Sequence, residues 1–162
     1  MRIAIVSHCI LNQNSVVKSL RRVKGSFKEV VSLLIKNDFG IIQLPCPELI
    51  YLGINREGRV KEEYDTEEYR ELCRELLKNI FKYIREYEKD GYKFLLIGIE
   101  GSPTCGIFKT ETKDGLREGR GILMEELLKY VNIKHKIEIP VGINNYKDFL
   151  KELERIISSM DE

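Results

Sequence analysis

Short apolar runs recur along the chain and predict a set of buried β-strands. Three of these runs are continuous and rich in Ile, Val and Leu, as are strands that are buried on both faces of a parallel sheet. A fourth run alternates between apolar and polar positions, which is typical of a strand with one face in water. The four runs span residues 3–6, 40–43, 94–99 and 136–140.

Helical spacing of apolar residues fills the intervals between these runs. Ser26 to Glu29 has the form of a capping box and predicts the start of a helix that ends before Gly40. Asp65 opens a second helix, and two more are expected over 122–131 and from near Asn145. The apolar stripe of the second helix comprises Tyr69, Leu72, Cys73, Leu76, Leu77, Ile80, Phe81 and Ile84.

The alternation of strands and helices predicts an α/β fold. We expect a three-layer α/β/α, Rossmann-like sandwich around a mostly parallel sheet of about four to five strands, because right-handed crossovers place helices on both faces. Two long connections, 44–65 and 109–121, are left without assigned elements. With no repeat or linker-like stretch in the sequence, we expect residues 1–162 to form a single domain.

Composition narrows the class of protein. Among the 162 residues, 27 basic side chains nearly balance 26 acidic ones, so no broad electrostatic footprint for nucleic acid is expected. No apolar run is long enough to span a membrane, and the N-terminus does not resemble a signal peptide. We therefore expect a cytoplasmic protein, in which cysteines serve as metal ligands, catalytic groups or core thiols rather than as disulfides.

Three of the four cysteines follow directly after predicted strands. Cys9, Cys46 and Cys105 lie just beyond the first, second and third runs, whereas Cys73 lies on a buried helical stripe and is expected to be structural. The loops that follow parallel strands all lie at the same edge of the sheet, so the three thiols are expected to converge there. A shared metal or cluster site is the preferred interpretation, although buried filler remains an alternative for each thiol.

The pattern of thiols leaves the kind of metal open. No C-x-x-C pair occurs, so neither a zinc-finger nor a ferredoxin spacing is present. Three thiolates leave one position of a four-site centre without a protein ligand. For zinc this would be an open catalytic position, and for a [4Fe-4S] cubane it would leave one iron free to act as a Lewis acid.

Three nearby side chains are candidates for supporting chemistry. Glu48, two residues after Cys46, is a candidate general acid or base, unless it is merely solvated. Ser102 would either donate a hydrogen bond to a substrate or cap a turn before Pro103. His8 is a possible fourth ligand, but a loop-edge His that points away from Cys9 is the simpler interpretation, and no chemical role is expected for His135.

A basic connection follows the third strand. It carries Lys109, Lys113, Arg117 and Arg120, and would gate a site or attract an anion unless it is simply a solvated loop.

The cysteine segments resemble the 2-thiouracil desulfurase family. The resemblance rests on Cys9 after the first strand, Cys46-Pro47-Glu48 after the second and Ser102-Pro103-Thr104-Cys105-Gly106 after the third. It implies a Rossmann-like domain with a [4Fe-4S] cluster held by the three cysteines, whose unique iron binds the sulfur of a thiolated pyrimidine. It further implies that Glu48 is the acid/base carboxylate and Ser102 a substrate-side hydroxyl. Residues 10–17 depart from the family's usual Leu-Gly and Arg-Tyr-Asp-Gly segments, so another thio-compound is conceivable as substrate.

The function expected from the sequence is thus [4Fe-4S]-dependent, non-redox desulfuration of a thiolated nucleobase or a related thio-heterocycle. Its partner would be a small thio-compound. Three alternatives remain open: a thiolation protein that uses a cluster-bound sulfide, a zinc hydrolase with the same three cysteines, and a sulfur carrier or partner-binding module without enzymatic activity.

Overall fold

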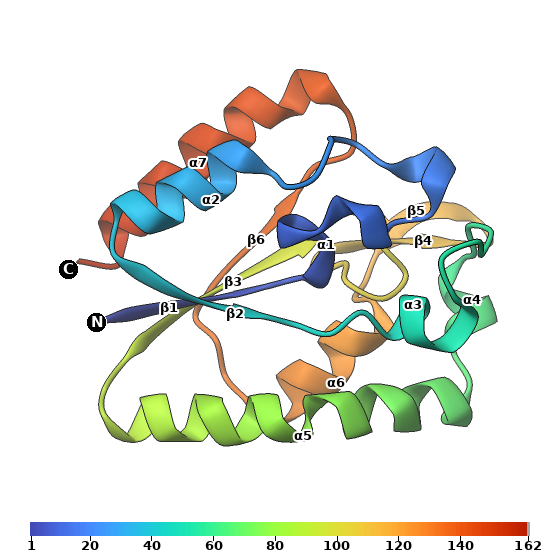
Figure 1. Cartoon of the computed structure of the whole chain (residues 1–162), viewed down its shortest axis with the longest axis horizontal. Coiled ribbons are helices and arrows are strands. Elements are labelled where there is room, and N and C mark those ends of the chain that lie inside the picture. Colours follow the sequence, from blue (N-terminus) through green and yellow to red (C-terminus); the bar gives the residue numbers. More distant parts are fainter. Residues whose placement is uncertain (162) are drawn as a thin grey trace.

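A four-stranded parallel sheet forms the centre of the molecule in the computed structural model, which describes residues 1–161 (Figure 1). The strand order is β2-β1-β3-β6, and Ile3 of β1 lies opposite both Gly40 of β2 and Phe94 of β3. All four predicted strands are confirmed. They span Arg2–Val6 (β1), Phe39–Gln43 (β2), Lys93–Ile99 (β3) and His135–Ile139 (β6).

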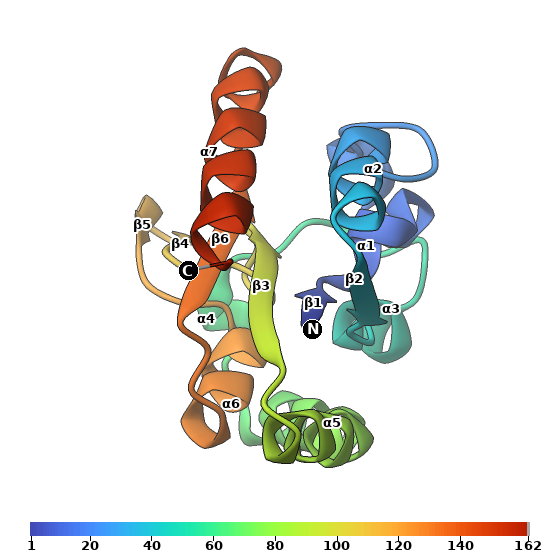
Figure 2. The ribbon, with the colours of Figure 1, turned by 90° about the vertical axis from the view of Figure 1, so that its left-hand side faces the viewer.

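Helices cover both faces of this sheet and complete a three-layer α/β/α sandwich (Figure 2). Helices α2 (Lys28–Lys36) and α7 (Tyr146–Ser159) pack together on one face. Helices α5 (Glu67–Lys89) and α6 (Ile122–Tyr130) pack together on the other. The predicted fold class is confirmed, with four strands in the main sheet.

Helix α5 follows the expected pattern closely. The Thr66 side chain caps its N-terminus by accepting a hydrogen bond from the Tyr69 amide across 3.2 Å. Tyr69, Cys73 and Leu77 are fully buried on its inner face. Cys73 therefore lies in the core, as expected for a structural thiol.

The capping box predicted at Ser26 is wrong. Helix α2 has Phe27 as its N-cap, and the Ser26 hydroxyl donates instead to the Leu11 carbonyl at 2.7 Å. Phe27 is 2% exposed and its amide donates to the Ile10 carbonyl at 3.0 Å. Tertiary contacts with the segment after β1 therefore decide how this helix begins.

The segments without predicted elements contain short ones. Connection 44–65 holds two helices, and connection 109–121 folds into an antiparallel hairpin. Elements of three to six residues carry too little periodicity to be recognised from sequence. They are α1 (His8–Leu11), η1 (Gln13–Ser15), η2 (Lys18–Leu20), α3 (Pro47–Leu52), α4 (Lys61–Tyr64), β4 (Lys109–Thr112), β5 (Gly115–Glu118) and η3 (Ile143–Asn145).

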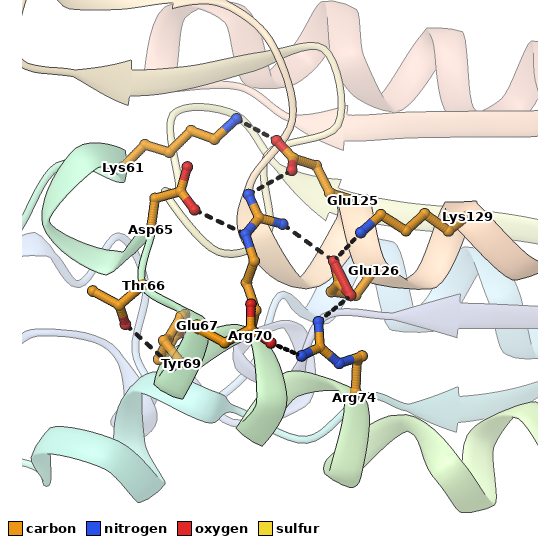
Figure 3. A network of polar contacts seen from close by, with 10 residues as sticks. All are labelled: Lys61, Asp65, Thr66, Glu67, Tyr69, Arg70, Arg74, Glu125, Glu126 and Lys129. Carbon is orange, nitrogen blue, oxygen red and sulfur yellow. Dashed lines mark hydrogen bonds and ion pairs between the residues drawn. The ribbon is translucent and has the colours of Figure 1, made fainter.

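A network of ion pairs joins α5 to α6 (Figure 3). Glu126 of α6 is fully buried and accepts hydrogen bonds from Arg70 and Arg74, each at 3.1 Å, and from Lys129 at 2.6 Å. Arg70 also contacts Glu125 at 2.9 Å. These charge-assisted bonds fix α6 against the longer helix.

Within residues 1–161, every helix is either too short or too polar to cross a lipid bilayer.

Candidate functional site

Three cysteines meet at a pocket on the carboxyl edge of the sheet. Cys9 lies in α1 directly after β1, Cys46 is the N-cap of α3 after β2, and Cys105 lies in the loop after β3. All three line one pocket of about 560 Å³, and all are free thiols. The structure thus brings together residues 37 and 59 positions apart (46 − 9 and 105 − 46).

Burial raises the pKa of all three thiols. Burial raises the pKa of Cys9 to about 12, and repulsion from Cys46 adds to the rise. Burial also raises the pKa of Cys105, with further repulsion from Cys9 and Cys46. Burial likewise raises the pKa of Cys46, although the Leu49 and Glu48 amides at the start of α3 act against that rise. Without a metal, the site therefore favours protonated thiols.

Close packing determines the position of the Cys105 loop. A Cβ atom built on Gly98 would lie 2.5 Å from the Cys105 carbonyl oxygen, and one on Gly121 would lie 2.3 Å from the Thr104 carbonyl carbon. Gly106 is equally confined, since its Cβ would lie 2.3 Å from the Lys109 carbonyl oxygen. Only glycine allows these backbones to approach so closely.

Ser102 supports the same loop. Its Oγ accepts hydrogen bonds from the amides of Cys105 at 2.9 Å and Thr104 at 3.3 Å, so it caps the turn, as one of the two sequence interpretations proposed. Ser102 also lines the pocket. An oxygen that accepts two amide protons still carries its own O–H, which leaves a donor for a ligand.

Glu48 is buried and held by three hydrogen bonds. Its side chain lies on α3, and the residue is 9% exposed, which excludes the solvated-loop interpretation. Oε1 accepts from the Tyr64 hydroxyl at 3.1 Å and from Arg56 Nε at 3.3 Å. Oε2 accepts from the Thr104 hydroxyl at 2.6 Å, and Tyr69 lies behind Thr104 at an oxygen–oxygen distance of 2.7 Å. Because Thr104 donates its single proton to Glu48, Tyr69 is the donor to Thr104.

His8 lines the pocket and has a defined tautomer in its neutral form. Its Nδ1 lies 3.2 Å from the Leu44 carbonyl oxygen, which only accepts, so Nδ1 carries the proton and Nε2 the lone pair. His135 lies on β6 and lines a different pocket, near the opposite edge of the sheet. The Lys109 and Arg117 side chains belong to the β4–β5 hairpin and are exposed outside the cysteine pocket.

Arg22 is a pocket residue that sequence reasoning missed. Its Nη1 donates to the carbonyls of Ile139 at 3.2 Å and Pro140 at 3.1 Å, and its Nη2 donates to the Glu100 carbonyl at 3.0 Å. Its positive charge acts against the raised pKa of Cys9. The signal in the sequence was the Arg21-Arg22 pair, which follows the segment that departs from the family pattern.

The departing segment itself shapes the site. Gln13, Ser15, Val16 and Val17 all line the pocket, and the wall continues through η2 to Arg22. Arg56, which also contacts Glu48, fixes this wall by donating to the Ser15 carbonyl at 2.8 Å. A change of side chain in this segment therefore alters the wall of the pocket.

The donor set fits an iron–sulfur cluster in chemistry and number. Three thiols on one pocket provide the soft ligands that such clusters take, and the fourth cysteine, Cys73, lies in the core on α5. Among residues 1–161, no group of three or more His, Cys, Asp or Glu side chains is arranged to hold a metal ion.

Comparisons with known proteins place this chain in a family. The model of the family described as "Putative 2-thiouracil desulfurase" matches residues 1–139. An uncharacterized protein of Methanocaldococcus jannaschii is 61% identical over 160 residues, which cover 96% of this chain and 97% of the relative. No solved structure matches the chain significantly.

Proposed function

This chain belongs to the 2-thiouracil desulfurase family just described, a family named for desulfuration, and we propose that it removes sulfur from a thiolated nucleobase or a related thio-heterocycle. In this proposal Cys9, Cys46 and Cys105 hold a [4Fe-4S] cluster. The observation that carries the proposal is the shared pocket, in which three free thiols lie with the buried, triply hydrogen-bonded Glu48.

The proposed reaction is a hydrolysis without electron transfer. Water adds to the carbon of the thiocarbonyl group, the carbon–sulfur bond breaks, and the products are the oxo-compound and sulfide. When bound, the cluster supplies a Lewis-acidic iron for the soft sulfur atom. The two protons of water leave with the sulfide or pass through a base of the protein, so the atoms balance without an external oxidant or reductant.

Glu48 is the proposed base. Tyr64, Arg56 and Thr104 hold its carboxylate in one orientation, so it needs no rearrangement to take a proton from water. Ser102 keeps an O–H for a polar atom of the substrate ring, since its oxygen already accepts the Cys105 and Thr104 amides. Glu48 and Ser102 line the same pocket, so both could act on one substrate.

The proposed substrate is a small thio-compound, because the pocket of about 560 Å³ lies in the size range of small-molecule sites. We propose the cytoplasm as the compartment, since a ligand set of free thiols needs reducing surroundings.

The test is anaerobic reconstitution of the full chain followed by iron and sulfide analysis, electron paramagnetic resonance and Mössbauer spectra. Incubation with 2-thiouracil should then release uracil and sulfide in equal amounts. A colourless preparation with one zinc and no sulfide would decide for a zinc hydrolase. Transfer of sulfur onto an acceptor, without net release of sulfide, would decide for thiolation. Cluster binding without turnover of any free thio-compound would favour a carrier.

A further inference from the structure

A guanidinium lies in the thiol pocket without a carboxylate partner. Arg22 lines the pocket together with Cys9 and interacts with it electrostatically. Within residues 1–161, its hydrogen bonds go only to three backbone carbonyls, and it forms no ion pair. Arg56, in contrast, is paired with Glu48 in the same pocket. The charge of Arg22 is therefore available to other negative groups of the site.

The sheet, rather than its own segment, holds this guanidinium in place. Its three acceptors, the carbonyls of Glu100, Ile139 and Pro140, directly follow or end β3 and β6. The Glu100 amide donates to the same Ile139 carbonyl at 2.9 Å, so the ends of the two strands form one anchor. Forked donation to this anchor gives the positive charge a defined position.

The acidic groups that interact electrostatically with Arg22 are Cys9, Glu100 and Glu138. The Glu138 carboxylate is already committed to the amides of Ile107 at 2.8 Å and Phe108 at 3.0 Å. Glu100 is half-buried, and its side chain makes no ion pair with Arg22. Cys9 is the member of this set that belongs to the proposed ligand trio.

We infer that Arg22 is the counter-charge of the cysteine ligand set and positions that set for an anionic iron–sulfur cluster. Three thiolates in a desolvated pocket repel one another strongly, and removing charges from water without compensation is costly. A fixed cation beside Cys9 offsets this cost, and it also stabilises the reduced cluster, which carries one more negative charge. This inference rests on the proposed function for the presence of the cluster, but it assigns a role to a residue outside the cysteine and glutamate motifs.

Three variants of the full chain test this role after anaerobic reconstitution. R22Q removes the charge and the forked hydrogen bonds, R22K keeps the charge with a weaker anchor, and R117Q is the matched control. Arg117 is exposed on the β4–β5 hairpin and lies outside the pocket. The measurements are the reduction potential of the cluster, from a redox titration followed by electron paramagnetic resonance, and the rate of iron loss to a chelator.

We expect R22Q to have a more negative reduction potential and to lose iron roughly tenfold faster than the wild type, as expected when one nearby charge is removed. R22K and R117Q should keep the wild-type potential. A wild-type potential in R22Q, or the same shift in R22K as in R22Q, would overturn the role of the charge. If R22Q does not fold, R22K decides alone, since a shifted potential there contradicts the inference and an unshifted one supports it. A wild-type chain that binds no cluster would overturn the proposed function and this inference together.

Discussion

The Thr104 hydroxyl donates to the Glu48 carboxylate across 2.6 Å. This bond joins the segment that carries Cys105 to the segment that carries Cys46. Thr104 precedes Cys105 directly, and Glu48 follows Cys46 by two residues. One short hydrogen bond between side chains therefore links the orientation of the acid/base candidate to the position of a thiol in another loop. The backing hydroxyl of Tyr69 extends this link to α5.

Replacing Thr104 by Val should impair both stability and turnover. The substitution leaves Oε2 of a buried carboxylate and the Tyr69 hydroxyl without their partner, which costs about 1–3 kcal/mol of unfolding free energy. Urea denaturation measures this cost, and the rate of sulfide release measures turnover. T104S keeps the hydroxyl and should recover most of both, so equal losses in the two variants would argue against the hydrogen bond.

Replacing Glu48 by Gln should retain the cluster and lower kcat at least about a hundredfold, because the amide cannot take a proton from water. Iron analysis and sulfide release check the two parts of this prediction. Glu118 on the β4–β5 hairpin is exposed and outside the pocket, so E118Q is the matched control and should turn over normally. Undiminished activity in E48Q would remove Glu48 from the mechanism.

Cys105→Ala should lose the full cubane, whereas Cys73→Ala should keep it. Cys105 lies in the pocket, and Cys73 is fully buried on α5 and packs in the core. We expect C73A to show only a loss of unfolding free energy of about 1 kcal/mol, the centre of the range for single substitutions. Mössbauer spectra of the reconstituted variants distinguish the two sites, and a complete cubane in C105A would contradict the assignment.

Gly121→Ala should displace the Cys105 loop. Its new Cβ would meet the Thr104 and Cys105 backbones at 2.3 to 2.7 Å, and backbone atoms cannot rotate away as a flexible side chain does. The expected cost is about 1–3 kcal/mol of unfolding free energy, with a loss of iron content after reconstitution. Gly58→Ala is the control, since the nearest atom there is a Leu20 methyl at 3.4 Å. Normal iron content in G121A would show that the loop has more room than the structure indicates.

The buried Glu126 should make stability depend on acidic pH. Burial alone would raise the pKa of its carboxyl group, but hydrogen bonds from Lys129, Arg74 and Arg70 outweigh burial and lower that pKa. A carboxyl group with a lowered pKa in the folded state stabilises the fold above its unfolded pKa and loses this contribution as pH falls through the folded value. E126Q should thus be less stable than the wild type near pH 7, by about 2 kcal/mol.

Urea denaturation of E126Q and the wild type, at pH 7 and at about pH 3, checks this sign. The two curves should approach each other at the lower pH. Glu71 is exposed on α5, the helix that supplies Arg70 and Arg74, and E71Q should follow the wild type at both pH values. A constant difference between E126Q and the wild type across this range would contradict the prediction.

The strands and the convergence of the three thiols could be predicted from the sequence, because they depend only on the apolar runs and on the parallel direction of the strands. Continuous apolar runs identify buried parallel strands, and every such strand ends at the same edge of the sheet. Cys9, Cys46 and Cys105 needed only this topology to be placed on one pocket. Their chemical role remains a prediction.

The supporting residues could not be predicted, because their partners come from distant elements. Tyr69 fits the apolar stripe of α5, and nothing in that spacing reveals that its hydroxyl donates to Thr104. In the sequence, Arg22 cannot be distinguished from the many surface cations. Only the structure shows that carbonyl groups at the ends of β3 and β6 accept its hydrogen bonds. At Ser26 the sequence pattern predicted a helix cap, but the hydroxyl donates a hydrogen bond to the Leu11 carbonyl instead. Local patterns cannot report such contacts.

Two consecutive residues of α5, Tyr69 and Arg70, contact different parts of the structure. Tyr69 holds the loop that carries Cys105 through Thr104. Arg70 holds Glu125 and Glu126 of α6, the helix after the β4–β5 hairpin (Figure 3). The loop is thus tied to a 23-residue helix packed in the core, rather than left to the fraying typical of surface segments. Its amides should exchange with solvent no faster than those of α5, so the mouth of the pocket and the layer beneath it would open as one cooperative unit.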